Sequence, residues 1–286
     1  MGNTENSNSF FTSNFEFSNN DKIPTEQEFA FFKKKIEGLI NLDLTNYKNT
    51  QMERRIASLM NRNGIDNLHA YYKILAEDPC KLNEFTNMLT INVSEFFRNC
   101  EKFKELETKY LPELLKKETR LKIWSAGCSI GAEIYSIAML LEKFGALERC
   151  ELVATDFDKN ILRKAQSGIY SKMEHDTVPR EYRHYFHPIP TAPHEEEKYQ
   201  INSKLISKIR FERQDLLKDK FEKNFDLILC RNVVIYFTEE AKDQLYAKFR
   251  ESLKENGILF IGSTERINNH KNFGYNLVTS FFYEAV

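Results

Sequence analysis

The spacing of apolar residues changes along the chain. From Thr25 to about residue 95, apolar side chains recur every three or four positions, which is the period of an amphipathic helix. A first helix is predicted after a Thr25 cap, with Glu28 in capping-box spacing. Its apolar face comprises Phe29, Phe32, Ile36 and Ile40. A second helix is predicted at residues 51–62, with Met52, Ile56, Leu59 and Met60 facing inward. These patterns indicate a small helical domain.

From residue 121 onward, short apolar runs alternate with helical segments. The stretch from Leu121 to Met139 (LKIWSAGCSIGAEIYSIAM) begins with a run typical of a buried strand and continues into a small-residue loop between Gly127 and Gly131. The apolar positions that follow have helical spacing: Ile134, Ile137, Ala138 and Leu141. Gly145 stands where a helix C-cap is expected. In a doubly wound sheet, a ligand binds over such a strand-to-helix turn.

The same alternation continues to the C-terminus. Further strands are predicted at residues 151–155, 209–213, 225–230 and 258–262. A helix capped by Thr238 is predicted to end at Gly257, and residues 275–284 are expected to add an antiparallel edge or hairpin. The pattern predicts an α/β fold with a Rossmann-like, largely parallel sheet, helices on both faces and a site along the carboxyl edge of the strands.

The glycine spacing of the first loop bears on the ligand. A dinucleotide fingerprint has the form G-x-G-x-x-G, whereas Gly127 and Gly131 give only G-x-x-x-G, with Ser129 at the middle position. Asp156, at the end of the next strand, is placed to accept two ribose hydroxyls. The two observations favour a nucleoside without a diphosphate over a nicotinamide dinucleotide. The alternative is that the glycines merely form a tight turn.

Five ordered motifs resemble one family. They are NVSEFFR at 92–98, AGCSIGAE at 126–133, AQSGIY at 165–170, CRNVVIYF at 230–237 and GSTE at 262–265. Together they resemble the CheR-type chemotaxis receptor methyltransferases, over about residues 25 to 286. The resemblance implies transfer of a methyl group from S-adenosylmethionine to glutamate side chains of chemoreceptors, leaving S-adenosylhomocysteine. It also implies a helical domain at 23–95 and a methyltransferase domain at 96–286, with a small β insertion at about 170–205. Residues 1–22 are rich in Asn and Ser, a composition that predicts a disordered tail.

The resemblance also implies which residues bind the cofactor. They are Asn92, Ser94, Arg98, Gly127, Gly131, Glu133, Asp156, Asp215, Leu216, Asn232 and Val233. Arg98 cannot act as a base at neutral pH, but it can clamp a carboxylate, either that of the methionine moiety or that of the substrate glutamate. Considered alone, an arginine at this junction would more often form an interdomain salt bridge.

The chemistry of methyl ester formation requires few catalytic groups. A glutamate carboxylate is already ionised at neutral pH and a sulfonium methyl is already activated, so alignment and removal of water dominate and no general base is needed. Arg98 and Tyr236 are the predicted catalytic residues, with the Tyr236 hydroxyl orienting the substrate carboxylate. The alternative for Tyr236 is a packing role beside Phe237.

One departure from the family pattern concerns the cofactor loop. The usual GEEPYS sequence is GAEIYS here, at residues 131–136. If the family's ligand contact belongs to the first glutamate, Ala132 cannot supply it and Glu133 must compensate. This loss keeps a second hypothesis open, a cofactor-binding sensor or receptor-tethering module without turnover. A nucleic-acid methyltransferase is disfavoured because residues 231–234 lack a Pro-Pro-aromatic sequence.

Basic residues of the second helix suggest a substrate surface. Arg54, Arg55 and Arg62 fall outside its apolar face, and the resemblance implies that they dock on the acidic methylation helices of chemoreceptors. The alternative is an ordinary solvated helix face. The insertion binds a receptor tail peptide in some members of the family, and the sequence leaves open whether it does so here.

Composition limits the remaining possibilities. The 286 residues are 41% hydrophobic with a net charge of -1, which gives no support to nucleic-acid binding by bulk electrostatics. No stretch suits a membrane span and no signal peptide is recognisable, so we expect a cytoplasmic location. We also expect a monomer. The five cysteines are scattered without a C-x-x-C pair, and the histidines of the insertion (His175, His184, His187 and His194) lack paired ligand spacing. We therefore expect no metal site.

Overall fold

The computed structural model describes residues 24–89, 94–192 and 194–286. The helical domain comprises α1 (Glu26–Ile40), the 3₁₀ turn η1 (Leu44–Asn46), α2 (Asn49–Arg62), α3 (Leu68–Glu77) and α4 (Pro79–Leu89). The predicted capping box between Thr25 and Glu28 is present. Phe29, Phe32 and Ile36 are buried as predicted and Ile40 is half-buried. The helices pack around an aromatic cluster of Phe32, Tyr71 and Phe85.

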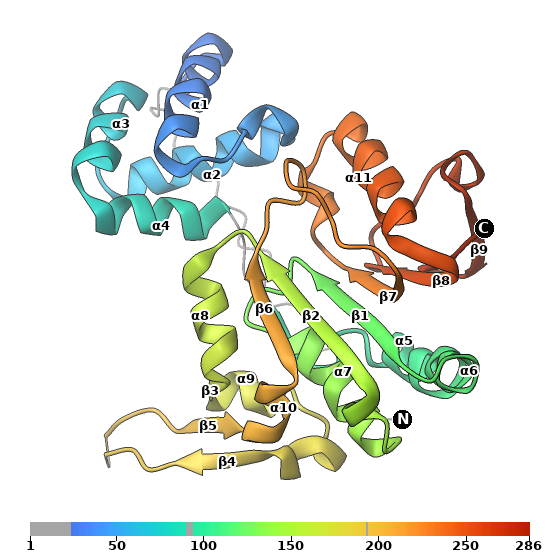
Figure 1. Cartoon of the computed structure of the whole chain (residues 1–286). Coiled ribbons are helices and arrows are strands. Elements are labelled where there is room, and N and C mark those ends of the chain that lie inside the picture. The colour runs from blue at the N-terminus through green and yellow to red at the C-terminus, as the bar shows by residue number, and fades with distance from the viewer. Residues whose placement is uncertain (1–23, 90–93, 193) are drawn as a thin grey trace, which may run out of the picture.

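A seven-stranded sheet forms the second domain, in the order β6-β2-β1-β7-β8-β10-β9. The strands are β1 (Leu121–Ala126), β2 (Cys150–Asp156), β6 (Ile209–Arg213), β7 (Phe225–Cys230), β8 (Leu253–Ile261), β9 (Tyr275–Thr279) and β10 (Phe282–Ala285). The first five are parallel, and β10 and β9 add the predicted antiparallel hairpin. The carboxyl ends of β1, β2 and β6 point toward the helical domain (Figure 1). The strand order changes direction at β1, beside β7, where open α/β sheets bind ligands.

Helices cover both faces of the sheet. One face packs against α5 (Cys100–Glu105), the π-helical turn η2 (Leu106–Tyr110), α6 (Leu111–Lys117), α7 (Ala132–Lys143) and α8 (Lys159–Ser167). The other face packs against α11 (Glu239–Ser252). Alternate residues of β1 divide between the two layers, since Ile123 belongs to the first cluster and Trp124 to the second. The expected Rossmann-like architecture is confirmed.

The end of α11 differs from the prediction. Gly257 was expected to end this helix, but the helix ends at Ser252 and Gly257 lies inside β8. Leu253 already has extended geometry and is buried. A Cβ at Gly257 would lie 3.0 Å from the carbonyl oxygen of Phe225, so the glycine permits a close approach to β7.

The expected β insertion is present as a small antiparallel sheet. Its strands are β3 (Ile169–Ser171), β4 (Phe186–Ile189) and β5 (Lys198–Ile201), in the order β3-β5-β4. Between and after them lie α9 (Lys172–Asp176), the 3₁₀ helix η4 (Arg180–Tyr185) and α10 (Ser203–Ser207). The insertion lies beside α8, at the end of the molecule away from α1 and α3 (Figure 1).

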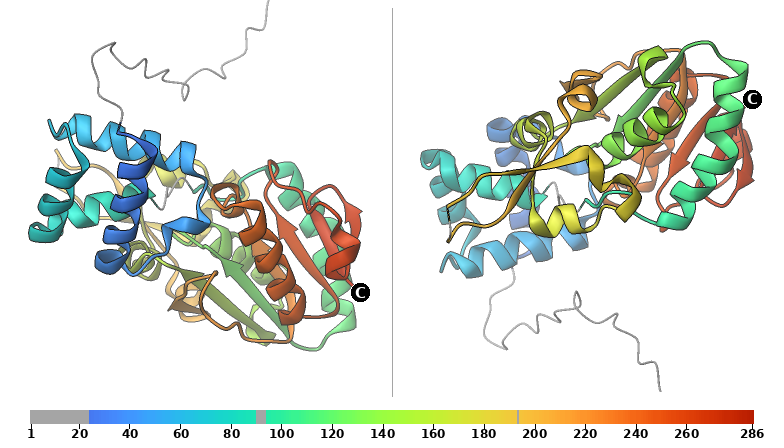
Figure 2. Two further views of the ribbon diagram at one scale, coloured as in Figure 1. Left: turned by 90° about the horizontal axis from the view of Figure 1, so that it is seen from above. Right: turned by 90° about the horizontal axis from the view of Figure 1, so that it is seen from below.

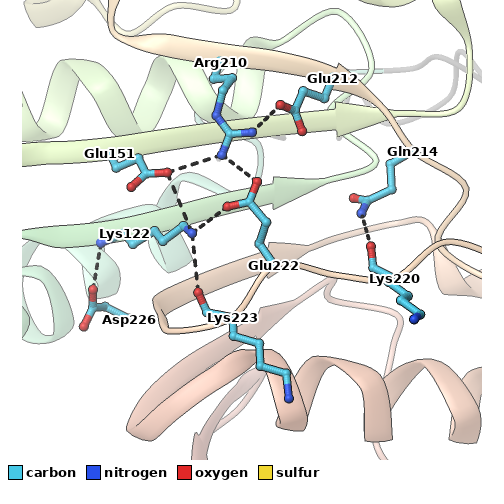
Figure 3. A network of polar contacts seen from close by, with 9 residues as sticks. All are labelled: Lys122, Glu151, Arg210, Glu212, Gln214, Lys220, Glu222, Lys223 and Asp226. Carbon is cyan, nitrogen blue, oxygen red and sulfur yellow. Dashed lines mark hydrogen bonds and ion pairs between the residues drawn. The ribbon is translucent and has the colours of Figure 1, made fainter.

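Charged side chains of β1, β2 and β6 form a network with Glu222, which lies between β6 and β7. Lys122 of β1 contacts Glu222 at 2.6 Å and Glu151 of β2 at 3.8 Å, and Arg210 of β6 contacts the same two glutamates at 2.7 and 3.3 Å (Figure 3). In these partly exposed pairs, each charged group has a partner of opposite charge. Surface pairs of this kind contribute little stability individually.

The two domains are joined by backbone hydrogen bonds as well as by the chain. Lys48 N donates to Tyr236 O at 2.9 Å, and Thr238 N donates to Asn46 O at 2.9 Å. These bonds flank a β-bridge between Tyr47 and Phe237. Figure 2 shows the helical domain beside the carboxyl edge of the sheet in two further views. Across the described residues, none of the helices has the length and apolar character of a membrane span.

Candidate functional site

A cavity of about 480 Å³ lies between the helical domain and the carboxyl ends of the parallel strands. Its lining comes from both domains and from the linker at residues 94–98. The lining residues are Leu42, Tyr47, Leu89, Ser94, Glu95, Arg98, Gly127, Cys128, Ser129, Glu133, Asp156, Phe157, Gln214, Asp215, Leu216, Arg231, Asn232, Val233, Ile235, Tyr236 and Phe237. The cavity therefore gathers most of the predicted site residues, including Ser94 and Leu216, from distant parts of the chain.

One predicted cofactor-binding residue, Asn92, falls outside the described residues. Another, Gly131, is not among the residues that line the cavity. Gly131 begins α7 with a φ of 82°, and a Cβ there would lie 3.1 Å from both Ala165 and the ring of Tyr135. Gly131 therefore permits close packing of α7 against α8, and its contact with the cofactor stays a prediction.

Gly127 has a different role from Gly131. Its φ is 77°, and a Cβ at this position would lie 2.5 Å from a methyl carbon of Val233. The backbone N–H groups of Gly127 and Cys128 both donate to Thr155 O, each at 2.8 Å, which ties the loop after β1 to β2. Only glycine satisfies both the conformation and the contact, so the open floor of the cavity depends on it.

Two carboxylates form one end of the cavity, above β2 and β6. Asp156 accepts hydrogen bonds from Ser129 N at 2.8 Å and Asp158 N at 3.0 Å. Burial raises the pKa of Asp156 to about 6, although these N–H groups oppose the shift. Asp215 accepts from Leu217 N at 2.9 Å in an Asx turn. Both carboxylates are thus held by backbone donors.

Tyr47 covers this end from the helical domain. Its ring packs edge-on against Phe237, with 5.1 Å between ring centres. Burial, followed by the carboxylates of Asp215 and Asp156, raises the pKa of its hydroxyl. Reading the sequence missed Tyr47 because its position in the short η1 connection carries no periodic signal.

Glu133 lies at the other end of the cavity. Its Oε1 accepts from Ser125 Oγ at 2.7 Å, and its Oε2 lies 3.4 Å from a guanidinium nitrogen of Arg231. Burial raises the pKa of Glu133, and Arg231 opposes the shift. Ala132 is instead buried in the core against the sheet. Having alanine at position 132 therefore does not remove a carboxylate from the cavity, because Glu133 supplies one.

The linker is anchored by the two phenylalanines that precede Arg98. Phe96 packs edge-on against Tyr170 at 4.9 Å between ring centres, and Phe97 stacks on Tyr182 at 4.4 Å. Phe97 N also donates to Ser136 Oγ at 3.0 Å. Arg98 follows directly and lines the cavity beside Glu133. The sequence-based expectation that these rings anchor the arginine at the domain junction is confirmed.

Asn232 follows β7 in a left-handed conformation, with a φ of 60°. Its buried Oδ1 accepts no hydrogen bond from any residue that the structure describes. Glu265 lies behind this turn, accepting from Gly262 N at 2.6 Å, and the backbone of Asn232 and Val233 helps to lower its pKa against the effect of burial. The wall of the cavity therefore includes a residue whose buried amide oxygen has no hydrogen-bond partner among the described residues.

Tyr236 and the basic helix α2 meet at the cavity. The Arg55 guanidinium lies 5.1 Å from the centre of the Tyr236 ring, a cation–π contact. Arg54 is exposed, and Arg62 is exposed and lies 3.9 Å from Glu84. Of the three predicted docking arginines, Arg55 alone is half-buried against a predicted catalytic residue.

Other reactive side chains near the site have no signs of catalysis. Cys128 is fully buried, and burial, with Asp156 and Glu133 nearby, raises the pKa of its thiol. A nucleophilic thiolate is therefore disfavoured. Within residues 24–89, 94–192 and 194–286, no group of three His, Cys, Asp or Glu side chains is arranged to hold a metal ion.

Comparisons with known proteins agree with this geometry. Residues 27–90 match the family model of the CheR methyltransferase all-alpha domain, and residues 92–281 match that of the CheR methyltransferase SAM binding domain. The chain is 42% identical over 260 residues to the chemotaxis protein methyltransferase of Listeria monocytogenes, covering 90% of this chain and 97% of that protein. It is 31% identical over 233 residues to the chemotaxis protein methyltransferase of Salmonella typhimurium, covering 79% of each chain.

Among solved structures, PKMT2 from Rickettsia typhi in complex with AdoHcy is similar with a TM-score of 0.33 and 18% identity, over 50% of this chain and 21% of that chain. That likeness is too distant to add to the family assignment. The two family models together span the helical domain and every strand of the sheet except β10. The chain belongs to the CheR family and is an S-adenosylmethionine-dependent chemotaxis protein-glutamate methyltransferase.

Proposed function

We propose that the cavity binds S-adenosylmethionine with its adenosine over Asp156, Asp215 and Leu216 and its amino-acid end toward Arg98, Glu133 and Asn232. Methyl transfer then occurs to a glutamate carboxylate of a chemoreceptor helix that approaches the cavity beside Tyr236. The observation that carries this proposal is that one cavity is lined by Asp156, Arg98 and Asn232. They bring a carboxylate, a guanidinium and an amide oxygen that has no hydrogen-bond partner among the described residues.

The adenosine end has the chemistry that a nucleoside requires. An ionised Asp156 has two oxygens that accept from ribose hydroxyls, and its backbone hydrogen bonds fix their direction. Asp215 is positioned at the next strand end, where its carboxylate can accept from an adenine amino group. Leu216 and Phe157 supply apolar lining there. The residues present therefore fit the adenosyl group.

The opposite end fits a zwitterionic amino acid. Asn232 Oδ1 and the Glu133 carboxylate are acceptors for an ammonium group, whereas Arg98 is a donor for a carboxylate. Ser94 adds a hydroxyl, or its backbone, from the linker. We assign Asn92 to the same site on the family resemblance.

The bound cofactor supplies a methyl group that is activated by its sulfonium charge. The protein aligns the acceptor carboxylate and excludes water from it, which strengthens its nucleophilicity. The Tyr236 hydroxyl orients that carboxylate, and the Arg55 cation over the Tyr236 ring keeps the ring in place. No residue needs to remove a proton, because the substrate is already anionic.

We propose that α2 docks on the acidic face of the receptor helix through Arg54, Arg55 and Arg62. Exposed Arg54 and Arg62 would steer association, whereas Arg55 lies close enough to Tyr236 to connect docking with the reacting carboxylate. The substrate glutamates belong to the cytoplasmic helices of receptors, so we also propose that the enzyme acts in the cytoplasm, as a monomer.

A labelling experiment tests the function. Purified protein is mixed with methyl-labelled S-adenosylmethionine and receptor cytoplasmic fragments, and base-labile methyl esters are counted. We expect labelled glutamyl esters that are lost in alkali. A protein that binds the cofactor by calorimetry yet labels no fragment would instead support the sensor or tethering hypothesis. Absence of cofactor binding would contradict both.

Docking is tested by charge reversal. Arg54→Glu should raise the KM for the receptor fragment several-fold. Cofactor affinity should change little, because the Arg54 side chain is exposed and does not line the cavity. Arg120→Glu is the matched control, since Arg120 is exposed before β1, at the opposite edge of the sheet. Equal effects of the two changes would rule out a specific basic surface.

A further inference from the structure

Arg231 is a buried cation that catalysis does not use directly. It directly follows β7 and is 8% exposed. Its guanidinium lies over the ring of Phe260 at 4.6 Å and over the ring of Phe103 at 5.3 Å. Phe260 belongs to β8 and Phe103 to α5, so the arginine contacts both the sheet and the helix that follows the linker.

The guanidinium contacts two segments other than its own. One terminal nitrogen donates to the backbone carbonyl of Arg98 and to Asn99 Oδ1, both at 2.7 Å. The other terminal nitrogen lies 3.4 Å from Glu133 Oε2. Arg231 thereby links the linker, the start of α7 and the turn after β7, which carry Arg98, Glu133 and Asn232 respectively.

The linker turn needs such support because its backbone is unfavourable. Phe97 has a φ of 52° and Asn99 a φ of 61°, so left-handed residues flank Arg98 on both sides. Residues other than glycine rarely adopt this region, and they persist there where surrounding contacts determine them. Arg231 donates hydrogen bonds to the Arg98 carbonyl and to Asn99 Oδ1, and these bonds stabilise the turn.

The electrostatic position of Arg231 also matters for Glu133. Burial raises the pKa of Glu133, and Arg231 is the first group to oppose the rise. Ser125, Arg98 and the same guanidinium together favour the ionised carboxylate. A lysine could supply the charge but not the planar fork that reaches the linker and Glu133 together.

We propose that Arg231 is a positioning residue for the amino-acid end of the cofactor, acting through Arg98 and Glu133. By holding the linker turn and the carboxylate at α7 in one arrangement, it sets the spacing between the group that binds the cofactor carboxylate and the group that binds its ammonium. The inference rests on the proposed orientation of the cofactor in the cavity.

The test compares two ligands that differ only at that end. Calorimetry measures the Kd of the full-length protein for S-adenosylhomocysteine and for 5′-methylthioadenosine, which lacks the amino-acid moiety. Arg231→Gln should weaken S-adenosylhomocysteine binding roughly 10- to 100-fold, with 5′-methylthioadenosine binding changed less than about twofold. Arg231→Lys, which retains the charge, should recover only part of the loss.

Asn99→Gly gives a milder version of the same test. Glycine accepts the left-handed backbone at this position, and the change removes only one acceptor of Arg231. It should weaken S-adenosylhomocysteine binding about two- to fivefold, again with selectivity for the amino-acid end. This variant keeps the proposal testable if Arg231→Gln fails to fold.

Two results would overturn the proposal. Equal weakening of both ligands would assign Arg231 to general stability, and unchanged binding of both would remove any role in the site. Arg98→Ala separates this failure from failure of the proposed cofactor orientation. If Arg98→Ala weakens S-adenosylhomocysteine selectively while the Arg231 variants do not, only the positioning role is wrong; if neither is selective, the orientation itself is wrong.

Discussion

The two ends of the cavity are built in different ways. At the adenosine end, Asp156 and Asp215 are held by backbone N–H groups, and the donors at Asp158 and Leu217 are only two residues away in the chain. At the amino-acid end, the Arg231 side chain holds the backbone carbonyl of Arg98 and the carboxylate of Glu133 across long separations. Arg231 is 133 residues from Arg98 and 98 residues from Glu133.

This difference has a physical consequence for mutation. A carboxylate held by local backbone donors keeps its position when its neighbours change, because the loop itself supplies the donors. The contacts of Arg231 come from side chains and segments far apart in the chain. Removing Arg231 leaves its buried partners without their hydrogen bonds and Glu133 without its ion pair. We therefore expect the amino-acid end to be the more sensitive of the two.

The largest expected effect is that of Arg98→Ala. Loss of a charge-assisted contact to a carboxylate, with Glu133 and Arg231 left beside it, should lower kcat/KM at least about 100-fold. The melting temperature should stay close to that of the unmodified protein, because Arg98 is half-buried at the cavity rather than in the core. Calorimetry with S-adenosylhomocysteine shows which carboxylate it binds, since weakened binding indicates the cofactor and unchanged binding indicates the substrate. Full activity would refute the assignment.

Gly127→Ala should come next. The new methyl group meets Val233 at 2.5 Å in a backbone conformation that alanine disfavours, so we expect a loss of about 2–3 kcal/mol of stability together with weaker cofactor binding. Gly145→Ala is the matched control, because Gly145 has a φ of 64° and open space around its missing Cβ. Urea unfolding of both variants isolates the steric part. Equal losses would show that backbone conformation alone explains the effect.

Asp156→Asn should have a smaller effect at the adenosine end. The amide keeps an acceptor but loses the charge, so affinity for S-adenosylhomocysteine should fall about tenfold above pH 7. The pKa of Asp156 in the free protein is about 6, so its ionised form, which accepts the ribose hydroxyls, is lost below that pH. Cofactor affinity should therefore rise with pH through about 6 and then level off.

The same shift has the opposite effect on the stability of the free protein. Because folding raises the pKa of Asp156 from 3.8 to about 6, its contribution to stability is present below the unfolded pKa and is lost as pH rises through the folded pKa. Asp156→Asn should flatten both dependences between pH 4 and 7. Binding curves and thermal melts across this range provide the check, and an unchanged pH profile in the variant would exclude Asp156 as their source.

Asp215→Asn should have the smallest effect. Asparagine can make the same Asx turn to Leu217 and still offers an oxygen to an adenine amino group. We expect the Kd for S-adenosylhomocysteine to change less than about threefold, with unaltered stability. A tenfold loss would mean that the charge at this position matters and that the two carboxylates of the adenosine end act together.

Much of the fold could be predicted from the sequence because its elements are local. The capping box at Thr25, the buried strand Phe225–Cys230 and the Thr238 cap all depend on residues a few positions apart. The error at Gly257 arose because Leu253 is buried against the sheet, so tertiary packing turned the chain into a strand before the glycine. Periodicity alone cannot separate the end of a helix from the start of a buried strand.

The site was predictable in part for a related reason. Asp156, Asp215 and Asn232 follow strands, and the ends of parallel strands meet at one edge of a sheet. The two glycines of the first loop look equivalent in sequence, yet Gly127 faces Val233 at the cavity and Gly131 faces Ala165 in the core. Their difference depends on which neighbours the turn brings close, and sequence spacing does not contain that information.

The amino-acid sequence by itself determined the order of elements, the strand-end polar residues and the family motifs, since these depend on local propensity and on residue identity. Tertiary structure alone decided that Tyr47 lines the cavity from the helical domain and that Arg231 joins the linker, the start of α7 and the turn after β7. These features come from packing between segments far apart in the chain, where the direction of a side chain follows from the placement of its whole element.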